Sequence, residues 1–264
     1  MHNKDLEAIY NSIYRRGEST HYTKLLFAKG DLAYDRIEVL KAIPSWKGKM
    51  VLDAGCGTGE LAYLIAERGA KRVIGIDYSS DAIAVAKSAH QCPNLLFQKT
   101  EIKNVRGKFD AVVCLGTLEH MDDPLAILRR FKELLKPGGS LIVSCPNWLN
   151  PRGYILTALR CLFDARITLA DLHYLTPFNF MEWGKILKME LEWKTVDHEW
   201  AHGKKMIDDL SRRLPNVARD SKLGIDEKKI KLFMEWLNRH AVPFERDTDY
   251  GGAIGVYHFK KASH

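Results

Sequence analysis

The chain of 264 residues is predicted to be an α/β protein with a doubly wound, mostly parallel sheet. Apolar runs near 49–53, 72–76, 95–98, 109–115 and 140–145 alternate with helical patterns near 59–68, 80–88, 124–135 and 177–189. Strands alternating with helices of this length are typical of βαβ units. The first apolar run also leads into an acid and three alternate glycines, in Val51-Leu52-Asp53-Ala54-Gly55-Cys56-Gly57-Thr58-Gly59.

Residues 1–45 precede the first strand and are predicted to form a helical arm or lid. Apolar side chains recur at helical spacing in 6–13 and again in 33–40. A polar, irregular stretch between them holds His21 and Tyr22, which a closing arm would bring to the site. A packed helix pair away from the site is the alternative. Pro44 ends the second helix.

The glycine-rich turn is predicted to lie against a ligand. Alternate glycines let the backbone approach a ligand closely, because no Cβ intervenes. The turn opens onto a helix that starts at Glu60, and the free N–H groups of a helix start favour a carboxylate or phosphate. The next apolar run ends in Asp77, and in doubly wound folds such an acid binds ribose hydroxyls. The expected ligand therefore has a ribose and an anionic or zwitterionic end.

The turn differs from the nicotinamide fingerprint Gly-x-Gly-x-x-Gly, because Glu60 stands where the last glycine is needed. It resembles the cofactor loop of class I S-adenosylmethionine-dependent methyltransferases. Three further stretches resemble the same family. Residues 108–114 resemble its fourth strand, residues 118–124 the loop and helix start that follow, and residues 135–143 the turn into its fifth strand. The resemblance covers residues 45–150 closely and is nearest to the quinone-biosynthesis and natural-product O-methyltransferase branch.

This resemblance implies a Rossmann-like, seven-stranded, mostly parallel sheet whose last strand is antiparallel, with the last two strands at 191–199 and 253–259. The core would comprise 46–200 and 250–261. Two segments fall outside the minimal core: 146–176, a substrate-side loop, and 203–246, a charged helical insertion. In that insertion Ile230, Phe233, Met234 and Leu237 are predicted to share one face.

The resemblance also implies where S-adenosylmethionine is held. Asp53 would order the loop and approach the amino group of the methionine part, or serve only to cap backbone N–H groups. Asp77 would bind the ribose. The other expected contacts lie in the glycine turn and after the second, third and fourth strands: Gly55, Cys56, Gly57, Gly59, Tyr78, Thr100, Glu101, Ile102, Leu115 and Gly116.

Methyl transfer from a sulfonium needs an acceptor held in line, exclusion of water and, for some acceptors, removal of a proton. No metal is expected. His120, just after the fourth strand, is one candidate base, since imidazole accepts protons near neutral pH. His173 is another, in a stretch that resembles the Asp-x-x-His…Thr-Pro entry to the late helix in a subgroup of these enzymes, with the acid one residue closer. Each histidine has a purely structural alternative, and the arm adds His21 and Tyr22.

Composition limits the setting and the partners. The net charge is +7, but the basic pairs are scattered and do not alternate with base-stacking aromatics, which argues against nucleic acid. Five cysteines without a Cys-x-x-Cys pair predict a reduced cytoplasmic setting rather than disulfides or zinc. No apolar run reaches membrane-spanning length.

The expected reaction is methyl transfer to a small molecule, most readily on oxygen of a hydroxyl, carboxylate or phosphate, with S-adenosylhomocysteine as the product. An anionic acceptor would suit the basic surface. An RNA or protein methyltransferase, a nicotinamide-dependent oxidoreductase and a non-catalytic S-adenosylmethionine-binding module are the alternatives. The oligomeric state stays open.

Overall fold

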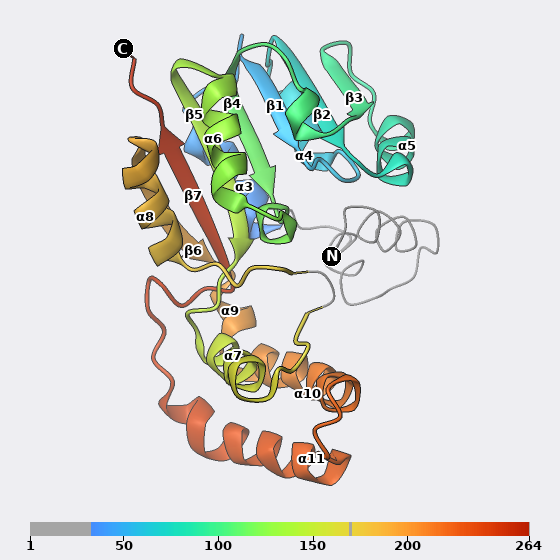
Figure 1. Cartoon of the computed structure of the whole chain (residues 1–264), viewed down its shortest axis with the longest axis vertical. Helices are drawn as coiled ribbons and strands as arrows, with labels where there is room; N and C mark the ends of the chain where they lie inside the picture. Colours follow the sequence, from blue (N-terminus) through green and yellow to red (C-terminus); the bar gives the residue numbers. More distant parts are fainter. Residues whose placement is uncertain (1–32, 169–170, 264) are drawn as a thin grey trace. The chain divides into compact units, whose positions relative to one another are not determined.

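The structure, a computed structural model, describes residues 33–168 and 171–263, in which strands and helices alternate along the chain (Figure 1). The predictions made for residues 1–32, including His21 and Tyr22, lie outside the described residues. The described chain divides into two compact units. The first holds residues 33–144, 180–192 and 256–263, and the second holds 145–168, 171–179 and 193–255.

One seven-stranded sheet runs in the order β3-β2-β1-β4-β5-β7-β6. The parallel pairs join β1 (Met50–Ala54), β2 (Arg72–Asp77), β3 (Leu95–Lys99), β4 (Phe109–Leu115) and β5 (Leu135–Pro146). The chain moves outward from β1 to β2 and β3, then returns to place β4 on the other side of β1. Ligands of such sheets bind beyond the strands' carboxyl ends where the order reverses. Here that point lies at the ends of β1 and β4.

The last two strands are β6 (Glu190–Val196) and β7 (Ile254–Lys260), and β7 runs antiparallel to β5. The N–H of Gly138 donates to Ala262 O (3.1 Å), and the N–H of Lys261 donates to Gly139 O (3.0 Å). Residue numbers fall along one strand as they rise along the other, as they do only in an antiparallel pair. The predicted Rossmann-like sheet with an antiparallel last strand is confirmed.

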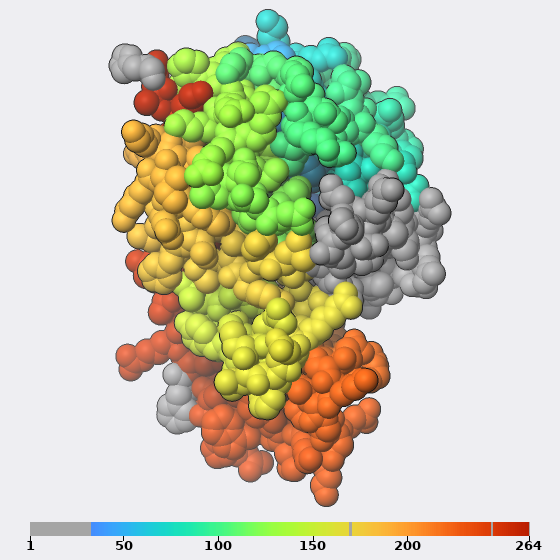
Figure 2. Space-filling view, in the orientation of Figure 1, coloured from blue at the N-terminus to red at the C-terminus, as the bar shows by residue number. Residues whose placement is uncertain are grey.

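Helices connect the parallel strands, and their starts follow ordinary capping chemistry. Asp123 accepts the N–H of Ala126 and caps α6 (Pro124–Leu134), and Ser79 accepts the N–H of Ala82 and caps α5 (Ser80–Ala89). The others that flank the sheet are α3 (Tyr34–Ala42), α4 (Glu60–Glu67) and α8 (Pro177–Leu187). Helices α6 and α8 lie side by side on one face of the sheet (Figures 1 and 2).

Two strand boundaries differ from the predicted ones. Strand β5 begins at Leu135, not near residue 140, because Gly138 and Gly139 pair with the end of β7. Strand β6 ends at Val196, although a strand was predicted through residue 199. Asp197 adopts a left-handed conformation (φ +57°), which breaks the strand, and the short helix α9 (His198–Ala201) follows.

The second unit is largely helical. Its helices are α7 (Pro151–Phe163), α9, α10 (Gly203–Asp220) and α11 (Glu227–Trp236), followed by the turns η3 (Leu237–Ala241) and η4 (Val242–Phe244). Ile230, Met234 and Leu237 are buried in its apolar core, whereas the side chain of Phe233 is exposed. No helix within the described ranges is long and apolar enough to cross a membrane.

Candidate functional site

The turn after β1 is held in a conformation that favours glycine. Gly55, Gly57 and Gly59 have φ values of +75°, +50° and +83°, in the left-handed region that side chains with a Cβ rarely adopt. The N–H groups of Gly55 and Cys56 both donate to Ile76 O, at 2.8 and 2.9 Å. The turn is therefore fixed against the end of β2, next to Asp77.

Two of these glycines also make room for neighbouring side chains of the protein. A Cβ on Gly55 would lie 2.3 Å from Thr117 Oγ1, and a Cβ on Gly59 would lie 2.4 Å from Phe97 Cζ. Glycine at these positions is thus required by packing as well as by backbone geometry. The contact at Gly55 also brings the loop after β4, which begins at Gly116, directly against the turn.

Asp77 links the turn to the ends of β2 and β3. Its Oδ2 accepts the N–H of Gly57 (3.1 Å) and its Oδ1 accepts the N–H of Ser79 (2.8 Å). Thr100 donates its N–H to Asp77 O (3.0 Å). Burial raises the pKa of the Asp77 carboxyl, while these N–H donors oppose the rise. Each carboxylate oxygen accepts two hydrogen bonds readily, so Asp77 retains acceptor capacity for a ligand.

Asp53, in β1, is 2% exposed, and its Oδ2 has no hydrogen-bond partner among the described residues. Burial raises the pKa of its carboxyl to about 7; the positive charge of Arg36 opposes this, and the negative charge of Asp77 adds to it. A buried acceptor without a donor costs free energy, which a ligand's ammonium or N–H group would recover. Asp53 is therefore suited to bind a cationic donor.

Arg36, on α3, belongs to this site and was not predicted. Its Nε lies 3.0 Å from Glu60 Oε2, at the first residue of the helix that the glycine turn opens onto. Beside it, Asp35 accepts a hydrogen bond from Ser144 Oγ (2.9 Å), which fixes α3 to the carboxyl end of β5. No local pattern marks Arg36, because only tertiary packing brings α3 to the turn.

The other predicted contact residues also belong to the first unit. Tyr78 and Leu115 are half-buried, and Ile102 begins the short turn η1 (Ile102–Asn104). Glu101 is exposed, and its Oε2 lies 2.7 Å from Lys103 Nζ. Gly116 is exposed and has a φ of +55°. Burial, with the charges of Asp53 and Asp77, raises the pKa of the Cys56 thiol, so Cys56 is not an activated nucleophile.

His120 lies on the turn η2 (Leu118–His120) after β4 and is buried, as is Glu119. The imidazole Nε2 is 3.9 Å from Glu119 Oε1. The backbone N–H of His120 donates to the carbonyl oxygen of Thr117 (3.1 Å), the residue whose side chain packs on Gly55. His120 is thus linked to the glycine turn through Thr117. His173 is half-buried and lies in the second unit.

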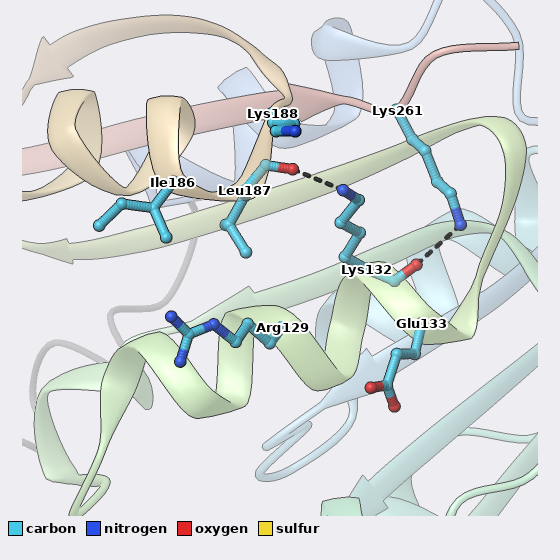
Figure 3. A pocket seen from close by; sticks show the side chains of 7 residues that line it. All are labelled: Arg129, Lys132, Glu133, Ile186, Leu187, Lys188 and Lys261. Carbon is cyan, nitrogen blue, oxygen red and sulfur yellow. Dashed lines mark hydrogen bonds between the residues drawn. The ribbon is translucent and has the colours of Figure 1, made fainter. Parts of the chain in front are cut away.

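A separate cavity of about 390 Å³ lies between α6 and α8 (Figure 3). Lys132 Nζ donates to Leu187 O (2.5 Å), and Lys261 Nζ donates to Lys132 O (3.0 Å), so both ammonium groups are engaged by backbone carbonyls. Lys261 follows β7, whose end pairs with the start of β5. The cavity therefore lies at the amino ends of the parallel strands, opposite the glycine turn. Its lining is Arg129, Lys132, Glu133, Ile186, Leu187, Lys188 and Lys261.

Metal binding finds no support in the described ranges, where no cluster of three His, Cys, Asp or Glu side chains could hold an ion. The site's polar groups are instead the buried carboxyl of Asp53, the half-buried carboxyl of Asp77, a guanidinium and backbone N–H groups. That set suits an organic ligand with ammonium, carboxylate and hydroxyl groups.

Known proteins with a similar sequence are methyltransferases. The family described as "Methyltransferase domain" matches residues 45–202. A ubiquinone biosynthesis O-methyltransferase of Xanthomonas campestris is 32% identical over 180 residues, 64% of this chain and 73% of that protein.

Two solved structures share the fold. Magnesium protoporphyrin IX methyltransferase of Synechocystis, with bound SAH (S-adenosylhomocysteine), is 20% identical, with a TM-score of 0.54 over 69% of this chain and 90% of that one. Phosphoethanolamine N-methyltransferase 2 of Haemonchus contortus, with S-adenosyl-L-methionine, is 16% identical, with a TM-score of 0.59 over 96% of this chain and 60% of that one.

Proposed function

The chain belongs to the class I S-adenosylmethionine-dependent methyltransferases, and on that premise we propose that it methylates an oxygen of a small-molecule acceptor. The similar proteins of Xanthomonas campestris and Dechloromonas aromatica are named as O-methyltransferases, which supports oxygen over nitrogen. We place the reaction in the cytoplasm, where a reducing environment suits the five free cysteines.

The residues of the site fit S-adenosylmethionine, and the observation that carries this assignment is the unpartnered Oδ2 of buried Asp53. Asp53 would accept the amino group of the methionine part. Arg36, whose guanidinium lies at the start of α4, would bind the carboxylate of the methionine part. Asp77 would accept the ribose hydroxyls with its remaining lone pairs, and the turn at Gly57 would contact the methionine backbone.

The bound cofactor supplies a methyl group that its positive sulfur already activates. The chain's own residues must then orient the acceptor, exclude water and receive a proton from the acceptor hydroxyl. We assign the proton to His120, because it is the predicted base that lies in the first unit, beside the loop that packs on Gly55. Glu119 lies close enough to stabilise the imidazolium that results.

The acceptor is proposed to carry a hydroxyl, carboxylate or phosphate oxygen, and an anionic one would suit the net charge of +7. RNA or protein acceptors and a non-catalytic binding role are the alternatives. A steep loss of affinity with salt would favour RNA. Failure of every acceptor to yield S-adenosylhomocysteine, despite tight cofactor binding, would favour the binding role.

The proposal is tested in two stages. Calorimetric titration with S-adenosylhomocysteine establishes cofactor binding by the full chain. Production of S-adenosylhomocysteine is then measured with phenols, sugar hydroxyls and carboxylates, and with amines as the matched comparison. The proposal is supported if the wild type methylates hydroxylated acceptors, and if His120→Gln loses this turnover but keeps its affinity for the cofactor. Turnover confined to amines would overturn the assignment to oxygen.

A further inference from the structure

Helix α11, labelled in Figure 1, carries apolar side chains that are exposed and not buried in the core of the second unit. Leu232, Phe233 and Trp236 are 56%, 37% and 55% exposed, whereas Ile230 and Met234 of the same helix are buried. A helix that packs on a domain normally turns only its apolar face inward and a polar face outward. The outward apolar side of α11 therefore has no explanation in the packing of its own unit.

Cations flank these exposed side chains. Lys228 and Lys229 precede them and Arg239 follows, and all are exposed. Lys229, Phe233 and Trp236 follow one another at helical spacings of four and three residues, so they share a side of the helix. The insertion from 203 to 246 has eleven Lys and Arg against seven Asp and Glu. The exposed side of α11 thus combines apolar and aromatic groups with positive charge.

This combination fits the surface of an anionic lipid bilayer. Tryptophan and phenylalanine side chains partition into the interfacial region, while neighbouring lysines stay among the headgroups and attract anionic lipid. A second copy of the chain would fit less well, because pairing this side with itself would bring like charges together. We propose that the exposed side of α11 docks this protein on anionic membrane surfaces. The helix lies in the plane of the interface and does not cross the bilayer.

The docking surface is defined by Lys228, Lys229, Leu232, Phe233 and Trp236, and its test does not depend on the acceptor. The full chain is sedimented with vesicles of phosphatidylcholine alone, or of phosphatidylcholine with about a third phosphatidylglycerol. Binding to the anionic vesicles that weakens with added salt is expected. Neutral vesicles should bind at least about tenfold more weakly.

Two variants remove the two components separately. Leu232→Ser/Phe233→Ser/Trp236→Ser removes the apolar groups, and Lys228→Glu/Lys229→Glu reverses the charge. Each is expected to lower binding to anionic vesicles at least about tenfold.

Matched control variants change the same kinds of group in the first unit. Met181→Ser/Ile186→Ser replaces apolar side chains that are 41% and 46% exposed. Lys71→Glu/Lys87→Glu reverses two exposed lysines. Both should bind vesicles like the wild type. Circular dichroism and affinity for S-adenosylhomocysteine confirm that every variant is folded.

Three outcomes would overturn the proposal. The wild type stays in the supernatant with anionic vesicles, or it binds neutral vesicles equally well. The control variants lose as much binding as the α11 variants. The α11 variants keep vesicle binding but abolish a dimer seen by sedimentation velocity, which would assign this side of the helix to a second copy.

Discussion

The buried carboxyl of Asp53 is expected to destabilise the protein when no ligand is bound. Folding raises its pKa from 3.8 to about 7, chiefly through burial. Each pKa unit corresponds to about 1.4 kcal/mol. Because the native protein holds this proton more tightly than the unfolded chain, stability falls as pH rises from the unfolded pKa through the folded one. The loss is complete above pH 7 and amounts to at most about 4 kcal/mol.

The substitution Asp53→Asn removes the negative charge of the side chain and keeps its shape. We therefore expect the ligand-free variant to be more stable than the wild type at pH 8, by up to about 4 kcal/mol, and to lose this advantage near pH 4. Urea unfolding at both pH values measures it. Asp110→Asn is the matched control. Burial raises the pKa of the Asp110 carboxyl, but hydrogen bonds from Lys136 and from the Met50 N–H outweigh burial and lower it. Asp110→Asn should therefore be less stable than the wild type at pH 8.

The same carboxyl links cofactor affinity to pH. A ligand ammonium binds the ionised form of Asp53, so affinity should fall about tenfold per pH unit below its pKa. Asp53→Asn should bind S-adenosylhomocysteine weakly at every pH and without this slope. An Asp53→Asn protein that is no more stable than the wild type at pH 8, or that keeps the slope, would refute the reasoning.

Three other substitutions test neighbouring assignments by calorimetric titration with S-adenosylhomocysteine. Asp77→Ala should cost about 2–4 kcal/mol of affinity, because the ribose hydroxyls lose a charged partner, and an unchanged affinity would move the ribose elsewhere. Gly57→Val should abolish binding in a folded protein, since valine does not tolerate a φ of +50°, and normal binding would separate the turn from the ligand. Arg36→Met should weaken binding at least about tenfold through the lost carboxylate contact, and it would exclude this role if affinity stayed the same.

The sequence predicts the parallel strands well because each is a short apolar run that ends at turn residues. It also indicates Asp53 and Asp77 as candidate site residues, because both lie where the first two strands end. Leu135-Lys136-Pro137-Gly138-Gly139 was interpreted as a turn, and it becomes strand because its partners lie near residue 261. The sequence around residues 135–139 does not reveal these distant partners.

The same reason applies to two further features. Arg36 reaches the site only through the packing of α3, which no spacing along the chain encodes. Helical periodicity predicts that Phe233 shares a face with Ile230 and Met234, but it cannot distinguish an apolar side chain that packs from one that stays exposed. Both features depend on tertiary contacts, and both residues have a proposed role in function.

The antiparallel closure by β7 makes this a chain with high contact order. Asn147 Nδ2 donates to Tyr250 O and Gly252 O, across 103 and 105 positions of sequence. Such contacts cannot form until residues 250–252 have left the ribosome. During synthesis β5 is an open edge strand, able to pair with other nascent chains. Protein ending before Ile254 should therefore aggregate, and production of the enzyme should depend on chaperones that shield this edge.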